Sequence, residues 1–370
     1  KGYRYYTFDD FEVLSAARED PLGFVNSLAD NAILDEVQKA PELFSSLKLA
    51  IDKDRRPGRF ILTGSANVFF VPKLSDSLAG RMEVIPLFPL AQCEIDGTKP
   101  RFLKDLFAGN IKMQQRERAG PEIFDRVLKG GYPVPLQREN LSRRRRWHRK
   151  YVDTLIQKDI RDLGRLSSFD AIPKLLELIA GQTSRLRNFS ELSGPFELSR
   201  QTIRHYVNLL EKIFLVDLLP PWHSNQIKRL VKTPKLHLGD TGLAAALLGK
   251  SEENLMQDRA FFGQLLESFI YNELKRQISW AESGFVNFFH YRDKDQYEVD
   301  LVIQKGTETF GVEVKAAATV TAKDFRGMKR LRQSLGNRFK CGVVLYDGEH
   351  SLPFGDRFYA VPIKALWSNQ

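Results

Sequence analysis

Cysteine is scarce in this sequence, and long apolar runs and metal-binding histidine spacings are missing. Cys93 and Cys341 are its two cysteines among 370 residues, too few for a disulfide framework or a zinc site, which favours a reducing compartment. No apolar run reaches the roughly 18 residues that cross a bilayer, and no secretory leader is visible. The six histidines show no metalloprotease spacing, and no Ser/His/Asp triad stands out. We therefore expect a cytoplasmic protein with no membrane partner.

The composition that remains is that of a globular protein with a basic surface. The hydrophobic fraction of 42% and the charged fraction of 28% are typical of soluble chains, and the length indicates two or three domains. The formal net charge of +10 suggests a polyanionic partner such as nucleic acid, with DNA favoured. An ordinary basic surface without such a partner is the alternative.

Two short apolar runs, residues 32–34 and 60–62, stop abruptly at polar residues, as buried parallel strands do where they leave a sheet. Between them, residues 41–52 place apolar side chains at helical spacing after a proline. This pattern predicts a strand-helix-strand unit, and ligands bind at the carboxyl ends of the strands in open α/β sheets. The residues expected at that edge are Asp35, Glu36, Thr63, Ser65 and Asn67.

The pair Asp35 and Glu36, directly after the first strand, suits hydrolysis of a nucleoside triphosphate. One carboxylate can help to hold Mg²⁺, and the second can orient the attacking water. A polar residue on the neighbouring strand can sense the γ-phosphate. The alternative is that both acids are ordinary polar caps of the following helix.

Four motifs around these strands resemble the second half of a prokaryotic AAA-type ATPase, and four more extend the resemblance over nearly the whole chain. The family consists of ATP-binding proteins that carry a C-terminal domain of unknown function. The first four motifs are YYTFDD at 5–10, ILDEVQ at 33–38, LTGSAN at 62–67 and SLAGR at 77–81. The others are GGYP at 130–133, LPPW at 219–222, DTG at 240–242 and EVK at 313–315.

The resemblance implies roles for five residues of the first domain, with ATP and Mg²⁺ as cofactors. Asp35 would be the Mg²⁺ carboxylate, Glu36 the water-orienting catalytic residue and Asn67 the sensor. Asp35, Ser65 and Asn67 are then the expected cofactor-binding residues. Arg81 would be a catalytic arginine finger, and the chain would form a homo-oligomer, as AAA-type domains often do in rings.

The phosphate loop of the family, G-x-x-x-x-G-K-[ST], is absent from these 370 residues and would lie upstream of Tyr5. Gly249, Lys250 and Ser251 supply the second half of the pattern, but Ala244 stands at the place of the first glycine. The apolar run before Gly249 also predicts a helix that this glycine ends. We therefore expect this chain by itself to hydrolyse ATP poorly.

The densest basic run in the chain is RRRRWHRK at 143–150, inside a region predicted to be mostly helical. Such a run can lie along a phosphate backbone, with Arg145 at the phosphates and Trp147 stacked on a base. The alternative is a solvated helical face that pairs with nearby acids.

Residues 188–193 and 199–212 predict two helices joined by a short turn, which resembles a helix-turn-helix. Ser199 would cap the second helix, and Arg200 and Arg204 would point outward toward nucleic acid. Winged helices also serve as protein–protein modules, so both readings stay open. The buried stripe of the second helix is expected at Ile203, Tyr206, Val207 and Leu210. The expected strands of the wing are 214–219 and 235–238.

The C-terminal third predicts a helix, three strands, a helix and a further strand, in that order. Gly306 and Thr307 suit a two-residue hairpin turn, and that register places Asp300 opposite Glu313. Like charges facing each other across a hairpin are destabilising, and a divalent cation between them would remove the penalty. The spacing therefore predicts a metal site.

This arrangement resembles the PD-(D/E)XK nuclease core. By that resemblance Asp300 and Glu313 would be metal ligands, Lys315 the catalytic lysine and Glu267 an additional metal-binding acid from the preceding helix. Two alternatives stay open: a solvent-facing sheet surface with salt bridges, and an inactive nuclease fold used only for binding.

Together these patterns predict a multi-domain α/β protein with part of a P-loop NTPase parallel sheet, closing with a strand at 82–87. A helical and winged-helix middle and a restriction-endonuclease-like C-terminal domain follow. The expected function is ATP binding and hydrolysis coupled to nucleic-acid binding or processing. The alternatives are a Mg²⁺-dependent nuclease and a non-catalytic DNA- or protein-binding regulator. The predicted domains are 1–98, 99–165, 166–250 and 251–370.

Overall fold

The computed structural model describes residues 2–28, 30–64, 78, 80–160, 168–223, 233–281 and 284–369. The chain forms two compact units, residues 1–86 with 212–214 and residues 87–211 with 215–370. In the described parts no helix has the length and apolarity needed to span a membrane.

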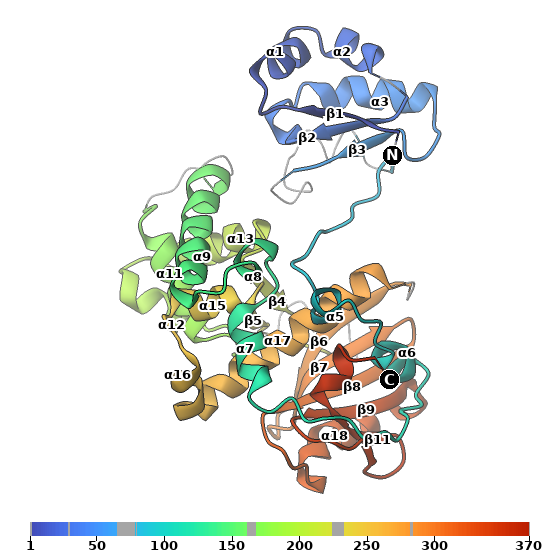
Figure 1. Cartoon of the computed structure of the whole chain (residues 1–370), viewed down its shortest axis with the longest axis vertical. Coiled ribbons are helices and arrows are strands. Elements are labelled where there is room, and N and C mark those ends of the chain that lie inside the picture. The colour runs from blue at the N-terminus through green and yellow to red at the C-terminus, as the bar shows by residue number, and fades with distance from the viewer. Residues whose placement is uncertain are drawn as a thin grey trace. The chain divides into compact units, whose positions relative to one another are not determined.

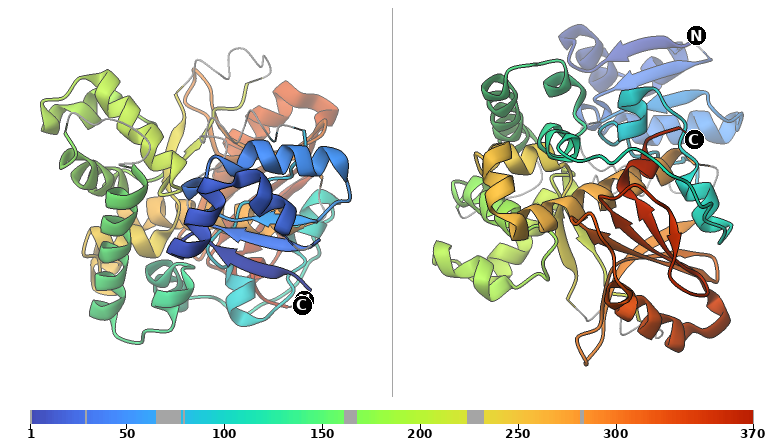
Figure 2. Two further views of the ribbon diagram at one scale, coloured as in Figure 1. Left: turned by 90° about the horizontal axis from the view of Figure 1, so that it is seen from above. Right: turned by 60° about the horizontal axis from the view of Figure 1, so that its bottom comes forward.

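The first unit contains a parallel sheet with helices on one side. The sheet order is β1-β2-β3, and each neighbouring pair is parallel. Right-handed crossovers between consecutive neighbours bring all connecting helices to the same face, as Figures 1 and 2 show for α1, α2 and α3. The predicted strand-helix-strand unit is confirmed. The strands are β1 (Arg4–Thr7), β2 (Ala32–Asp35) and β3 (Phe60–Leu62). The helices are α1 (Phe11–Glu19), α2 (Pro21–Ser27) and α3 (Leu43–Lys53).

The core of the first unit forms between β2 and α3. Leu34 of β2 and Leu43, Phe44 and Leu47 of α3 are fully buried in one apolar cluster. The helical spacing in the sequence therefore predicted the buried face of α3 correctly. Burying each of these side chains contributes about 1.5–3 kcal/mol to folding.

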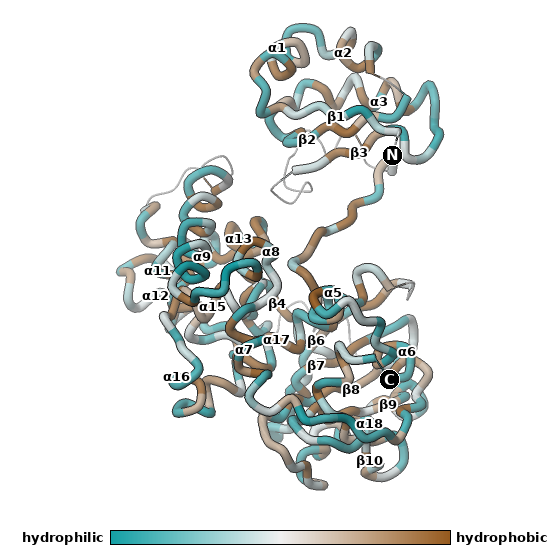
Figure 3. The backbone as a smooth tube through the Cα atoms, viewed as in Figure 1, coloured by the Kyte–Doolittle hydropathy of each residue, from teal (hydrophilic) through white to brown (hydrophobic). Residues whose placement is uncertain are grey.

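The predicted strand at 82–87 is wrong. These residues pair with no strand in the described chain, and Ile85 and Leu87 are 76% and 99% exposed. The boundary between the two units falls directly after Pro86. Figure 3 shows a hydrophobic connecting segment here, so local apolarity indicated a strand that has no neighbour to pair with.

The first half of the second unit is mainly helical, with a small antiparallel β4-β5 pair. The predicted helix with its serine cap is confirmed, because Ser199 Oγ accepts a hydrogen bond from Thr202 N at 3.1 Å. Its predicted buried stripe is also buried. The first helices are α5 (Gln92–Asp96), α6 (Phe102–Phe107), α7 (Glu122–Lys129), α8 (Pro133–Leu136), α9 (Leu141–Leu155) and a π-helical turn (Ile156–Ile160). The next are α11 (Ala171–Gly181), α12 (Phe189–Ser193), α13 (Arg200–Lys212), α15 (Thr241–Leu247) and α16 (Glu252–Gln257). The strands are β4 (Val216–Leu219) and β5 (Lys235–Leu238).

The second half contains a six-stranded mixed sheet of order β10-β11-β9-β8-β7-β6. The predicted order of a helix, three strands, a helix and a strand is confirmed, and β10 and β11 follow as strands that the sequence patterns did not predict. The helices are α17 (Arg259–Trp280) and α18 (Arg326–Leu335). The strands are β6 (Val286–Arg292), β7 (Glu298–Lys305), β8 (Glu308–Lys315), β9 (Phe339–Tyr346), β10 (Leu352–Pro353) and β11 (Phe358–Pro362).

The β7-β8 hairpin has the predicted register. Lys305 pairs with Glu308, and Leu301 pairs with Val312. Gly306 has a φ of +58°, as the first turn residue of a type II′ hairpin requires. Asp300 and Glu313, the next residues along each strand, are therefore brought together.

Two of the motifs, GGYP and DTG, meet in a buried polar cluster. Asp240 is fully buried and accepts hydrogen bonds from Gly131 N at 2.7 Å, Leu243 N at 3.0 Å and Arg276 Nη2 at 3.0 Å. A Cβ added at Gly131 would lie 2.3 Å from Leu90 O, and one at Gly242 would lie 2.4 Å from Lys129 O. The glycines of these motifs are required because other backbone segments approach too closely for a side chain.

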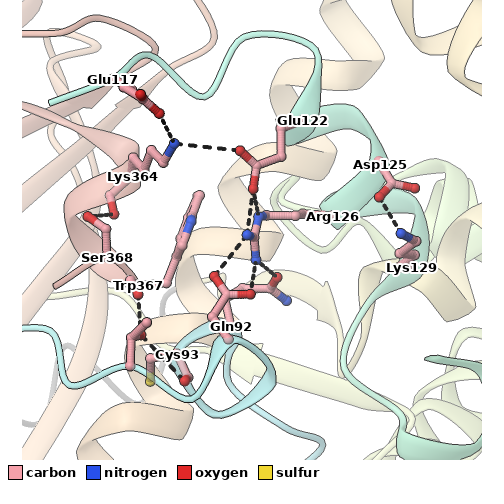
Figure 4. A network of polar contacts seen from close by, with 12 residues as sticks. Gln92, Cys93, Glu117, Glu122, Asp125, Arg126, Lys129, Lys364, Trp367 and Ser368 are labelled. Atoms are coloured by element: carbon pink, nitrogen blue, oxygen red, sulfur yellow. Dashed lines mark hydrogen bonds and ion pairs between the residues drawn. The ribbon is translucent and has the colours of Figure 1, made fainter. Parts of the chain in front are cut away.

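A second polar network joins α5 and α7 to the last residues of the described chain (Figure 4). Arg126 donates to Glu122 Oε1 at 2.6 Å and to Gln92 Oε1 at 3.0 Å. Its guanidinium also lies 5.1 Å from the ring centre of Trp367. Lys364 pairs with Glu117 at 3.3 Å and with Glu122 at 3.8 Å. Arginine is suited to this position because its planar head can stack and donate several hydrogen bonds at once.

Candidate functional site

The carboxyl edge of the first sheet gathers hydroxyl groups around Asp35, the last residue of β2. Asp35 Oδ2 accepts hydrogen bonds from Tyr5 Oη at 2.5 Å and Thr7 Oγ1 at 3.3 Å, and Oδ1 accepts one from Thr63 Oγ1. These bonds, led by those from Thr63 and Tyr5, lower the pKa of Asp35. The carboxylate is therefore ionised at neutral pH, and a hard cation such as Mg²⁺ prefers such an oxygen ligand.

Glu36 follows Asp35 in a left-handed conformation, with a φ of +56°. A residue other than glycine held in this region costs on the order of 1–3 kcal/mol, and such residues cluster at functional sites. Its side chain accepts a hydrogen bond from Gln38 Nε2 and makes no capping hydrogen bond to the following turn. The alternative that Glu36 is an ordinary helix cap therefore loses support.

Arg81 lies at the other end of the same unit from Asp35. Its Nε and Nη2 both donate to the Asp52 carboxylate at 2.9 Å. Asp52 is in the last turn of α3, and α3 runs back from the carboxyl end of β2 to the start of β3. The predicted cofactor-binding residues Ser65 and Asn67 lie outside the described residues.

The four predicted residues of the C-terminal site lie together. Asp300 Oδ2 accepts a hydrogen bond from Val314 N at 3.0 Å, and Glu313 Oε2 accepts one from Asp300 N at 3.4 Å. Lys315 Nζ donates to Glu313 Oε1 at 3.1 Å. Lys235 links Glu267 of α17 to this group, because its ammonium contacts both Glu267 and Asp300. The sequence therefore identified these four side chains as one cluster.

Lys235 is the residue of this cluster that the sequence reading missed. Its Nζ lies 2.7 Å from Glu267 Oε1 and 3.5 Å from Asp300 Oδ1, and its side chain is 9% exposed. The available signal was a lysine at the start of β5, whose four residues are all buried. A lysine is rarely buried unless it is paired.

Burial sets the proton affinities in the cluster. Burial, reinforced by Asp300, raises the pKa of Glu267 to about 8 and that of Glu313 to about 8. Burial lowers the pKa of Lys235, but Glu267 and Asp300 outweigh it and leave that pKa above its ordinary value. Lys235 is therefore a permanent cation near neutral pH, and the two glutamates hold protons more tightly than exposed glutamates do.

The cluster fits a divalent cation poorly. Among the residues that the structure describes, no group of three or more His, Cys, Asp and Glu side chains is arranged to hold a metal ion. The ammonium groups of Lys235 and Lys315 already contact oxygens of all three carboxylates. The metal-ligand roles of Glu267, Asp300 and Glu313 stay a prediction.

The predicted nucleic-acid residues of α9 make contacts within the protein. Arg145 Nη2 donates to the Lys250 carbonyl. Trp147 stacks on Tyr151, with ring centres 4.9 Å apart and planes at 10°. The exposed arginines of this run are instead Arg143, Arg146 and Arg149, which sequence reasoning did not single out.

The two arginines predicted at the start of α13 are exposed. Arg204 lies 5.0 Å from the ring centre of Phe189, and Arg187 lies 4.2 Å from the same ring. Arg200 and Arg204 are therefore both accessible near the start of α13, and Arg204 lies against α12.

A pocket of about 280 Å³ lies in the second unit, and one of its lining residues directly follows a residue of the cluster in sequence. α17 supplies Arg259 and Phe262, and Ala316, directly after Lys315, supplies another wall. Arg259 Nη2 donates to Ala316 O at 2.7 Å. No sequence pattern indicated this pocket, because its walls come from distant segments.

Comparison with known proteins divides the chain into three parts. Residues 1–96 match a family described as an AAA domain. Residues 120–254 match a domain of unknown function, DUF8612, and residues 262–366 match another, DUF4143. The resemblance to AAA-type proteins with a C-terminal domain of unknown function is confirmed at this coarser level.

Three curated relatives are also similar to this chain. Uncharacterized proteins of Mycobacterium bovis and Mycobacterium tuberculosis are each 26% identical over 358 residues, covering 96% of this chain and 74% of the relative. An uncharacterized protein of Methanocaldococcus jannaschii is 23% identical over 308 residues, covering 77% of this chain and 63% of the relative.

Proposed function

We propose that this protein binds ATP with Mg²⁺ through an AAA-type domain and couples that binding to nucleic acid. The observation that carries the proposal is the placement of Asp35 at the carboxyl end of β2, among three hydroxyl donors. Ligands in open α/β sheets bind at this edge. The match of residues 1–96 to an AAA domain supports it.

Each residue of this edge has a defined task in the proposal. Asp35 stays ionised because Thr63, Tyr5 and Thr7 donate to it, so it can serve as the Mg²⁺ carboxylate. Glu36 would accept a hydrogen bond from the attacking water and orient it. Mg²⁺, when bound, would neutralise charge on the phosphate oxygens. The proposal gives Arg81 a structural task in this unit, since it pairs with Asp52.

The test of ATP binding uses a protein that carries a phosphate loop ahead of Tyr5. Asp35→Asn should abolish Mg²⁺-dependent binding of a fluorescent ATP analogue, measured by titration. Asp52→Asn, which removes a carboxylate from the far end of α3, is the matched control and should leave binding within about twofold. Equal binding by wild type and Asp35→Asn would remove Asp35 from the site.

The nucleic-acid half of the proposal is supported by the net charge of +10 and by the exposed arginines of α13. Arg200→Ala with Arg204→Ala should weaken binding of labelled double-stranded DNA and flatten its salt dependence. Lys323→Ala with Lys329→Ala removes the same charge from other exposed positions and is the control. Identical losses from both pairs would indicate nonspecific attraction to a basic surface.

A second candidate function follows from the C-terminal cluster. The element order from α17 to β9 and the grouping of Asp300, Glu313 and Lys315 favour a nuclease-like fold. The two ammonium groups within the cluster favour its use for binding over metal-dependent cutting. Incubating labelled DNA with Mg²⁺ or Mn²⁺ should therefore give no scission, whereas cutting that Asp300→Ala abolishes would establish the nuclease.

A further inference from the structure

The buried strand β5 brings an ammonium group into the C-terminal carboxylate cluster. Lys235 Nζ contacts Glu267 Oε1 at 2.7 Å and Asp300 Oδ1 at 3.5 Å. These two acids come from α17 and β7, so the lysine links two separate elements. A divalent cation that joined Glu267 and Asp300 would compete with Lys235 for these two carboxylates.

The backbone on both sides of Lys235 is fixed. β5 pairs with β4, where Lys235 stands opposite Leu219, and it also forms a bridge with Leu186 on its other side. Arg187 N donates to Pro234 O at 2.8 Å, and Leu236 N donates to Arg185 O at 2.9 Å. Hydrogen bonds hold the strand on both sides. The folded backbone therefore positions the ammonium group of Lys235 at the two acids.

Three further carboxylate oxygens of the cluster are also engaged. Asp300 Oδ2 accepts from Val314 N at 3.0 Å, and Glu313 Oε2 accepts from Asp300 N at 3.4 Å. Lys315 Nζ donates to Glu313 Oε1 at 3.1 Å. A lysine ammonium competes with a divalent cation for a carboxylate because both are positively charged, and Lys235 and Lys315 together contact all three carboxylates.

The sum of the charges in the cluster also disfavours a divalent cation. Glu267, Asp300 and Glu313 carry three negative charges when ionised, and Lys235 and Lys315 return two positive ones. A divalent cation added to this set would leave an excess positive charge in a largely buried place, which is unfavourable. Without Lys235, the set would carry two negative charges, which match a divalent cation.

We propose that Lys235 takes the place of the divalent cation that the nuclease resemblance implies, so that this cluster is complete without metal. The C-terminal domain then keeps the arrangement of a nuclease and uses Lys235 as a fixed counter-ion. This inference goes beyond ATP and nucleic-acid binding, and its failure would leave the proposal for Asp35 untouched.

Manganese binding to the full chain tests the proposal, with Mn²⁺ alone as the probe and electron paramagnetic resonance as the readout. Wild type should show no saturable Mn²⁺ site that depends on Asp300. Asp300→Asn in the wild-type background should therefore leave Mn²⁺ binding unchanged. Lys235→Met should gain one Mn²⁺ per chain, at least about tenfold tighter than any wild-type binding, and Asp300→Asn added to it should remove this gain. Lys275→Met removes a lysine that pairs with Asp217 elsewhere in the unit and should gain nothing.

Two results would overturn the proposal: wild-type Mn²⁺ binding that requires Asp300, or a folded Lys235→Met variant that gains none. Thermal unfolding covers the case in which Lys235→Met does not fold. Lys235→Met with Glu267→Gln removes both members of the close pair, so its unfolding midpoint should lie nearer to wild type than that of Lys235→Met alone. A double variant no more stable than Lys235→Met would contradict the counter-ion role.

Discussion

Asp240 and Glu273 show, for single residues, how the second unit buries carboxylates. Asp240 is fully buried and accepts three hydrogen bonds. Glu273 is 1% exposed and accepts from Gln92 N at 2.8 Å and from Gln277 Nε2 at 2.7 Å. A buried carboxylate is tolerated only when its oxygens are hydrogen-bonded in this way.

Glu273 should make the second unit less stable as the pH rises. Burial raises the pKa of Glu273 above its ordinary value of 4.5, so the folded state binds its proton more tightly than the unfolded state does. The contribution of Glu273 to the free energy of unfolding is fully present below pH 4.5. It is lost as the pH rises through the folded pKa, by about 1.4 kcal/mol per unit of difference between the folded and unfolded pKa.

Glu273→Gln should therefore flatten the fall of the unfolding free energy as the pH rises above 4.5, measured with urea at several pH values. The amide keeps the size of the side chain and cannot ionise. Glu253→Gln, at an exposed position of α16, should leave the curve unchanged. A Glu273→Gln curve parallel to that of wild type would show that the pKa of Glu273 is the same in the folded and unfolded states.

Among the structural elements, the close approach of Gly131 to Leu90 and to Arg276 of α17 limits which side chains position 131 can accept. A Cβ at Gly131 would lie 2.3 Å from Leu90 O and 2.5 Å from Arg276 Nη1. Gly131→Ala should therefore lower the free energy of unfolding by about 1–3 kcal/mol, the usual effect of overpacking.

Gly263→Ala is the matched control for that substitution, because nothing lies within 4 Å of the added methyl group. Gly263 is inside α17, where alanine should be neutral or raise stability by up to about 1 kcal/mol. Chemical denaturation of both variants measures the difference. A Gly131→Ala protein as stable as wild type would mean that Leu90 and Arg276 move aside at little cost.

The sequence predicted the elements that depend on local patterns and missed those that depend on distant partners. Helical spacing located α3 and α13, and alternation located β7 and β8, because each pattern repeats within a few residues. The same reasoning failed at residues 82–87, since a strand needs a neighbour that local apolarity does not reveal. Lys235 was missed because its partners Glu267 and Asp300 are 32 and 65 residues away.

For the whole molecule, the exposed apolar segment after the first unit predicts a preferred site of proteolysis. Ile85 and Leu87 are exposed at the boundary between the two units. Such segments are the usual sites of nicking. Brief digestion with thermolysin should cut near Leu87 first and give two stable fragments, identified by mass spectrometry. First cuts inside β6–β9 would contradict the division into two units.

The hydrogen bond from Thr98 Oγ1 to the Trp367 carbonyl joins residues 269 positions apart in the chain. At roughly 5–20 residues per second, a ribosome needs on the order of tens of seconds to make the residues between them. Throughout that time α5 and α7 emerge without the segment around Lys364 and Trp367 that the network in Figure 4 requires. Chaperones that bind nascent chains would therefore encounter an incompletely synthesised second unit, after the first unit has had time to fold.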